Sequence, residues 1–202
     1  MERTTTHLTQ KQLNTQAAIN GVYLGLISVV ITLIIFYVSP AIMGSPSFGI
    51  ISMVVMLAIS IYFILEMRKK NGGYWAFREA LSAIFIFFFV TLLTSSLIML
   101  GFGKVESTYE NTMRDITLNS MTEMSETLFP NNPEAADAMI LEAEKSLDKQ
   151  YNPTIGQFLT SQGLMAIFCF IGALIFALIF KRNRPVFAID PEEEAQRPTY
   201  TE

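Results

Sequence analysis

The chain has 202 residues, of which 51% are hydrophobic and only 16% are charged, with a formal net charge of -4 at pH 7. A soluble domain has about 25% charged residues, so this composition favours a membrane protein. The net charge is unsuited to a nucleic-acid partner, which calls for a basic face. The single cysteine, Cys169, and the single histidine, His7, exclude a disulfide framework and the common zinc, haem and Ser-His-Asp sites within one chain. We therefore expect no metal, no cofactor and no nucleic-acid partner.

Three long segments without any charged residue dominate the chain: Gln12–Leu65, Ala80–Gly103 and Gln150–Phe180. A membrane-spanning helix needs about 20 mostly apolar residues, so the first segment is long enough for two spans. Prolines and glycines between Ser39 and Gly49 break it in the middle. The sequence therefore predicts an all-α membrane protein with four transmembrane helices, at residues 18–38, 48–65, 80–102 and 158–180.

Basic residues set the predicted orientation of these spans, because they gather on the cytoplasmic side of a membrane. The loop 67–79 carries four of them, and the segment that follows the fourth span carries three within four positions. All these positions share one side only if both termini are cytoplasmic. The tails 1–17 and 181–202 are then inside, and the segment 103–157 lies outside the cytoplasm.

The segment 103–157 carries two amphipathic patterns with a spacing of three to four residues, which is typical of helices. A break at Phe129–Asn132 separates them, and Pro133 fits the first position of a helix. We predict helices at 106–128 and 133–150 that form an antiparallel hairpin, with apolar stripes facing each other as a cap. The alternative is a partner-binding surface, since methionine adapts to partners and four methionines lie on or beside the stripes: Met113, Met121, Met124 and Met139.

The loop 67–79 offers one candidate binding surface. Its basic and aromatic side chains could hold a lipid phosphate or a partner protein, although basic residues at a membrane boundary are first of all topology signals and anchors. The candidate contact residues are Arg68, Lys69, Lys70, Trp75 and Arg78.

Two ridges of small residues at four-residue spacing lie in the first and fourth spans, and such ridges let helices approach closely. They are Ala17, Gly21 and Gly25, and Cys169, Ala173 and Ala177. The simplest prediction is that the two ridges pack against each other within one chain; the alternative is an interface with a second copy or a partner. In the third span, the hydroxyls from Thr91 to Ser96 are expected to bond to their own helix backbone rather than to line a solute path.

Three stretches resemble one family of bacterial membrane proteins: Asn20–Leu26, Gly72–Ala80 and Ala173–Lys181. The family is the domain of unknown function 4199, from the inner membrane of Bacteroidota-type Gram-negative bacteria. It has no assigned activity, so the resemblance implies no catalytic residue. Its genes often lie beside a glycosyltransferase similar to polyprenyl-phosphate sugar synthases, so the resemblance implies such an enzyme as a partner.

The leading functional hypothesis is a non-enzymatic accessory or anchoring subunit that binds a membrane protein partner or a second copy of itself in the bilayer. The alternative is a small oligomeric transporter or channel. An enzyme ranks last, because only Glu66, Arg78 and Glu79 approach the cluster of polar groups at one membrane face that lipid-phosphate chemistry needs.

Overall fold

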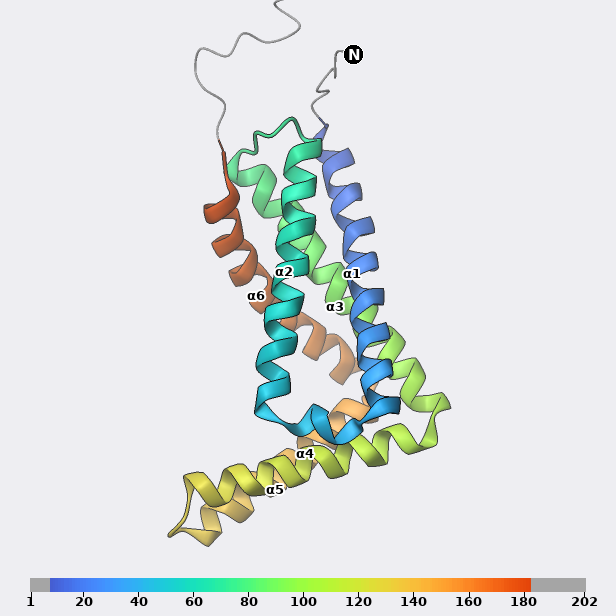
Figure 1. The fold of residues 1–202 in the computed structure, drawn as a ribbon, viewed down its shortest axis with the longest axis vertical. Coiled ribbons are helices and arrows are strands. Elements are labelled where there is room, and N and C mark those ends of the chain that lie inside the picture. The colour runs from blue at the N-terminus through green and yellow to red at the C-terminus, as the bar shows by residue number, and fades with distance from the viewer. Residues whose placement is uncertain (1–7, 183–202) are drawn as a thin grey trace, which may run out of the picture.

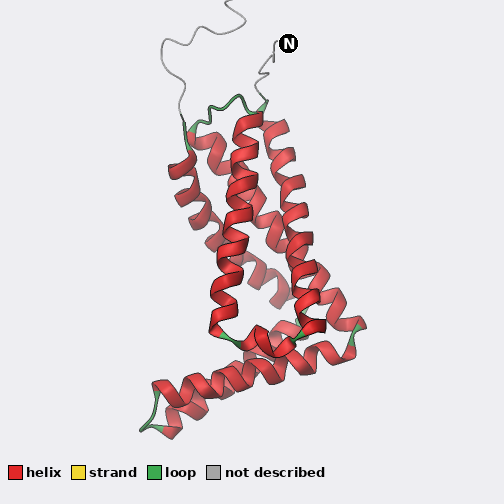
Figure 2. Ribbon diagram, in the orientation of Figure 1, coloured by secondary structure: helices red, strands yellow, loops and turns green. Residues whose placement is uncertain are grey.

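The computed structural model describes residues 8–182, and this part of the chain consists of helices and their connections, with no β-strand (Figures 1 and 2). Four of the helices are long and apolar enough to cross a membrane: α1, α2, α3 and α6. In chain order the elements are α1 (Gln10–Val38), the 3-10 helix η1 (Pro40–Gly44), α2 (Pro46–Lys70), α3 (Phe77–Val105), α4 (Ser107–Leu128), α5 (Pro133–Tyr151) and α6 (Ile155–Phe180). Most of the predicted tails, residues 1–7 and 183–202, lies outside the described residues.

Each predicted span lies inside a longer helix, because caps in the polar flanks start the helices before the apolar residues begin. Thr9 accepts a hydrogen bond from the backbone of Gln12, whose side chain bonds back, so α1 begins at Gln10 rather than at 18. Thr154 and Gln157 form the same capping box before α6. Asn132 caps α5 by accepting a hydrogen bond from the backbone of Ala135, and Pro133 occupies the first turn as the sequence predicted.

Helix α3 is the centre of the membrane bundle, because α1 and α6 both pack most extensively against it. A Cβ atom added to Gly21 would lie 2.7 Å from the backbone oxygen of Phe87, and one added to Gly25 would lie 3.0 Å from that of Thr91. The small residues of α1 therefore admit the backbone of α3. The prediction that the two small-residue ridges face each other is wrong: the glycines of α1 meet α3, and α6, with its Ala173 and Ala177 fully buried, packs on α3 as well.

The start of α1 and the end of α6 lie at one end of the bundle, which we call the terminal end (Figure 1). The core fills this half, with side chains that are 0–1% exposed, among them Leu24, Ile64, Ile84 and Phe87. Phenylalanine rings of different helices contact each other there at tilted or edge-on angles. The ring centre of Phe63 lies 6.0 Å from that of Phe87, and the ring centre of Phe88 lies 5.2 Å from that of Phe176.

Helices α4 and α5 form the predicted antiparallel hairpin, which lies across the opposite end of the bundle, here called the hairpin end (Figure 1). Its apolar stripes are buried at the base, where Tyr109 is 7% and Leu147 is 5% exposed. Toward the tip they open, with Met124 41% and Leu128 58% exposed. The remaining three methionines are half-buried: Met113, Met121 and Met139. The hairpin is thus a closed cap at its base and an open surface at its tip.

Helix α4 also packs on η1, which joins the first two spans. Ser120, the residue that interrupts the apolar stripe of α4, donates a hydrogen bond of 3.0 Å to the backbone oxygen of Gly44. A Cβ atom on Gly44 would lie 2.7 Å from the Ser120 Oγ atom, so only glycine permits this approach. The hairpin is therefore fastened to the connection between α1 and α2.

The close approach of α1 to α3 predicts the effect of adding one methyl group. Gly21→Ala should lower the free energy of unfolding by about 1–3 kcal/mol, because the new Cβ atom would overlap the Phe87 backbone and force the helices apart. Gly101→Ala is the matched control, since its Cβ atom would meet nothing within 4 Å. Thermal unfolding in detergent measures both. Equal melting temperatures for the two variants would contradict the packing argument.

Candidate functional site

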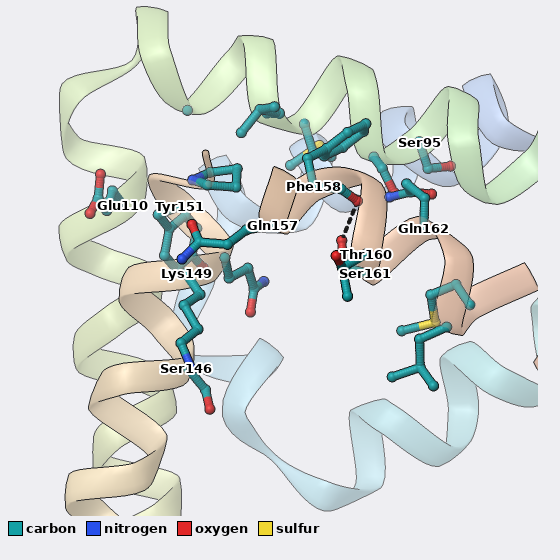
Figure 3. A pocket seen from close by; sticks show the side chains of 18 of the residues that line it. Ser95, Glu110, Ser146, Lys149, Tyr151, Gln157, Phe158, Thr160, Ser161 and Gln162 are labelled. Carbon is teal, nitrogen blue, oxygen red and sulfur yellow. Dashed lines mark hydrogen bonds between the residues drawn. The ribbon is translucent and has the colours of Figure 1, made fainter. Parts of the chain in front are cut away.

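A cavity of about 1030 Å³ opens between α3, the first half of α6 and the base of the hairpin (Figure 3). Helix α3 lines it from Ser95 to Gly103, α6 lines it from Gly156 to Met165, and α4 and α5 contribute side chains near their junction with the bundle. Thr32 is its one lining residue from α1, and α2 contributes none. The cavity is therefore formed by the bundle and the hairpin together and not by either alone.

The cavity ends inside the bundle. From Ser95 to Gly103 there are eight steps of about 1.5 Å each, so the cavity covers about 12 Å along α3. A membrane's hydrocarbon core is about 30 Å thick. Beyond the cavity, toward the terminal end, Thr91 is buried and the core described above is filled by Phe87, Ile84 and Leu24. In this conformation the cavity is a blind pocket and not a path across the bundle.

Several hydroxyls in or next to the cavity wall bond to their own helix backbone. The sequence predicted this for the hydroxyls from Thr91 to Ser96, and among them Thr91 shows it. Thr91 donates to the oxygen of Phe87 at 2.7 Å, and Thr160 donates to that of Gly156 at 2.8 Å. Ser95 differs, because it donates across helices to the oxygen of Gly25 on α1 at 3.2 Å. The sequence pattern could not show that this side chain lies between two helices and borders a cavity.

Aromatic rings join the hairpin to the bundle beside the cavity. Tyr109 of α4 packs edge-on against Phe36 of α1 at 5.1 Å and Phe102 of α3 at 5.2 Å, and Tyr151 of α5 lies 6.1 Å from Tyr109. Burial raises the pKa of Tyr109, and burial together with the neighbouring Tyr109 and Glu110 raises the pKa of Tyr151 to about 12. Both phenols therefore stay neutral at physiological pH.

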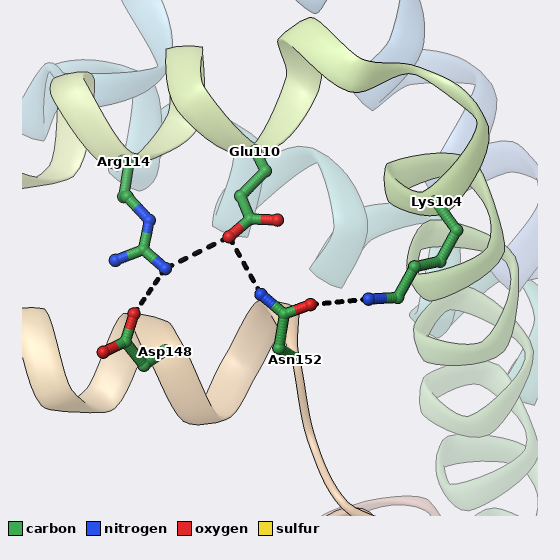
Figure 4. A network of polar contacts seen from close by, with 5 residues as sticks. All are labelled: Lys104, Glu110, Arg114, Asp148 and Asn152. Atoms are coloured by element: carbon green, nitrogen blue, oxygen red, sulfur yellow. Dashed lines mark hydrogen bonds and ion pairs between the residues drawn. The ribbon is translucent and has the colours of Figure 1, made fainter.

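A chain of polar contacts closes the same junction (Figure 4). Arg114 of α4 bridges Glu110 at 3.1 Å and Asp148 of α5 at 2.6 Å. Asn152, just after α5, donates to Glu110 at 3.1 Å and accepts from Lys104 of α3 at 2.6 Å. Exposed ion pairs contribute about 0–1 kcal/mol each, so this network chiefly orients the three helices that meet at the cavity.

The basic loop proposed from the sequence lies at the terminal end, far from the cavity (Figure 1). Lys69, Lys70 and Arg78 are exposed and Arg68 is half-buried. Lys70 pairs with Glu66 at 2.9 Å. Three of these basic residues lie in the last turn of α2 and Arg78 lies in the first turn of α3. The chain turns between them at Gly72 and Gly73, whose φ angles of 76° and 82° suit glycine.

Trp75 does not belong to that exposed surface, because its side chain is 0% exposed. Its backbone pairs with that of Arg182 through hydrogen bonds of 2.8 and 2.9 Å, and the Arg182 guanidinium lies 5.8 Å from the centre of the Tyr74 ring. Asn71, 1% exposed, donates to the Tyr74 oxygen at 3.1 Å. Trp75 therefore anchors the end of α6 to the loop and cannot contact a lipid phosphate in this conformation.

No group of three or more histidine, cysteine, aspartate or glutamate side chains is placed to hold a metal ion within residues 8–182. Cys169 is buried and does not line the cavity. The described residues thus present three surface features: the cavity, the exposed cations of the basic loop and the open tip of the hairpin.

The raised pKa of Tyr151 predicts a measurable pH dependence. Because the phenol ionises near 10 when unfolded and near 12 when folded, its contribution to stability is complete below pH 10 and is lost as pH rises toward 12. The tyrosinate absorbance of the wild-type protein minus that of Tyr151→Phe should therefore rise near pH 12. A step near pH 10 in folded protein would show that Tyr151 is exposed to water.

Comparison with known proteins finds one family. No curated protein and no solved structure shows significant similarity to the chain. A family model described as a protein of unknown function, DUF4199, matches residues 19–182. This range includes most of α1 and all of η1, α2, α3, α4, α5 and α6. The match confirms the resemblance of the three stretches noted in the sequence, and the chain belongs to the DUF4199 family.

Proposed function

We propose that the chain is a non-enzymatic accessory subunit that holds a membrane partner through its basic loop. The observation that carries this proposal is the construction of the loop. Backbone pairing of Trp75 with Arg182 and burial of Asn71 fix its base, while Lys69 and Arg78 extend into solvent without an ion pair among the described residues. A fixed turn with free cations loses little entropy on binding, which suits a docking surface.

In the proposed orientation the terminal end faces the cytoplasm of a bacterium and the hairpin lies outside it, across the inner membrane. The charges support this assignment. The four basic residues of the loop lie at the terminal end, whereas the hairpin helices carry the acidic side chains Glu110, Glu123, Glu126, Asp137, Glu142 and Glu144, together with others. Cytoplasmic loops retain lysine and arginine, so the basic end is the inner one.

The partner class rests on the family resemblance, which associates these proteins with polyprenyl-phosphate glycosyltransferases. Such an enzyme would present its catalytic domain on the cytoplasmic side, where the basic loop lies in the proposed orientation. An acidic surface on the enzyme would complement Lys69 and Arg78. A second copy of the chain is the other candidate partner.

A transporter or channel remains the alternative, favoured by one observation: the cavity borders Ser95 and the polar start of α6. The filled core of the terminal half opposes it. A conducting path would need the side chains of Phe87, Ile84 and Leu24 to leave positions where they are 0–1% exposed. We therefore favour the accessory role.

The orientation predicts which positions react with a reagent that cannot cross the membrane. In a Cys169→Ala background, Lys145→Cys on α5 should be labelled by an impermeant maleimide on spheroplasts, because it lies at the hairpin end. Lys69→Cys should be labelled only after the membrane is opened. The reverse pattern would invert the topology and place the basic loop outside.

The docking role predicts a specific loss of partner. The tagged chain, co-expressed with the neighbouring glycosyltransferase of its own genome and extracted in mild detergent, should recover that enzyme in stoichiometric amount by mass spectrometry. Lys69→Gln combined with Arg78→Gln should reduce the recovery several-fold, since both free cations are lost while Arg68 and Lys70 keep the topology signal. Lys145→Gln is the control at the opposite end and should recover the enzyme fully. Purification of the chain alone at full yield would refute the proposal.

A further inference from the structure

We propose that the cavity at the hairpin end binds one phospholipid by its phosphate head group and the first part of its acyl chains. This site is independent of the basic loop, so either proposal can fail without the other. The proposal rests on where the cavity lies relative to the membrane, on the charge at its rim and on the polar and apolar groups that its wall offers.

The cavity lies at the depth where a lipid's glycerol meets its chains. Its α3 wall, Ser95 to Gly103, is the last part of a segment free of charged residues, and charge returns at Lys104. The cavity therefore extends from the membrane boundary into the hydrocarbon region. A soluble solute would have to enter past the hairpin, whereas a lipid of the same leaflet is already at this depth.

The wall is open toward the lipid. No residue of α2 lines the cavity, although α2 belongs to the same bundle, and α2 and α6 make little contact with each other. Leu164 and Met165, which line the cavity from α6, are also 55% and 46% exposed at the surface that a bilayer would cover. Acyl chains can therefore leave the cavity sideways, so its volume need hold only part of a lipid.

The rim carries one cation that no carboxylate neutralises. Lys149 of α5 lines the cavity and makes no ion pair within residues 8–182, and Figure 3 shows it beside Ser146 on the hairpin side. The one carboxylate in the lining, Glu110, is already bonded to Arg114 and Asn152. The free charge at the rim is thus positive, which selects a phosphate over an ammonium group.

Deeper than this cation the wall carries both amide and apolar side chains. Gln157 and Gln162 of α6 present side-chain amides to the cavity, with Gln162 near Ser95 in Figure 3. Gln157 lies in the first turn of α6, close to the rim, where its amide can donate to the ester carbonyls of a lipid. Met99, Leu100 and Leu164 supply apolar surface for the chains, and Ser95 and Gln162 lie at the deep end. The cavity therefore offers a cation, amides and apolar surface to the phosphate, esters and chains of a phospholipid.

Native mass spectrometry of the full chain in mild detergent tests the proposal with three probes: a whole phospholipid, its diacylglycerol part and its glycerol phosphate part. Phosphatidylglycerol should remain bound as one molecule per chain. Diacylglycerol with the same chains and glycerol 3-phosphate without chains should both bind more weakly.

Lys149→Gln should weaken phosphatidylglycerol binding about fivefold, as expected for one lysine facing an anionic lipid. Gly156→Leu should also weaken it by narrowing the cavity near its rim, because a Cβ atom there meets nothing within 4 Å and so displaces no neighbouring group.

Two matched control variants distinguish lipid binding in the cavity from nonspecific lipid binding to the protein surface. Lys145→Gln removes a cation from α5, and Gly163→Leu adds the same side chain to α6 in open space, yet neither position lines the cavity. Both should bind phosphatidylglycerol as the wild type does. Equal losses in Lys149→Gln and Lys145→Gln, equal retention of diacylglycerol and phosphatidylglycerol, or unchanged binding in Gly156→Leu would each overturn the proposal.

Discussion

The approach of α1 to α3 at Gly21 and Gly25 determines the arrangement of the other helices. Lipid chains are as apolar as leucine, so membrane helices associate through close packing rather than through the hydrophobic effect. The glycines let α1 contact the α3 backbone, and the small residues of α6 let it pack on α3 too. Because α1 and α6 both pack on α3, they do not pack extensively on each other. The space left at the hairpin end is the cavity.

The hairpin completes this space because it is fastened at three places. Tyr109 inserts between the ends of α1 and α3, Ser120 bonds to Gly44 in the connection before α2, and Asn152 bonds to Lys104 at the end of α3. Each fastening joins the hairpin to a different part of the bundle. A rotation of α1 on α3 would therefore move the hairpin, and with it the rim residue Lys149.

The sequence predicted the elements well and their pairing poorly, for a physical reason. Charge-free length and caps are local properties, so the four long apolar helices and both hairpin helices were found, with helix starts displaced where a cap such as Thr9 lies outside the apolar run. A small-residue ridge shows that a helix packs closely but not against which neighbour, so the partner of Gly21 was wrongly predicted. Trp75 resembled an interfacial aromatic residue until its pairing with Arg182 showed it to be buried. The cavity was missed because no local pattern distinguishes a Ser95 that faces its own helix from one that faces a gap.

Binding and conduction make opposite demands on the two halves of this bundle. A pore needs polar groups along its whole length, but the groups near the cavity stop at Ser95, and the next turn of α3 is sealed by Thr91 bonded to its own backbone and by the fully buried Phe87. A binding pocket instead needs a firm floor, which this aromatic core supplies. The basic loop lies beyond that floor, separated from the cavity by the filled half of the bundle. A lipid held at one end could influence a partner at the other only through α3 and α6, the two helices that extend from the cavity to the loop.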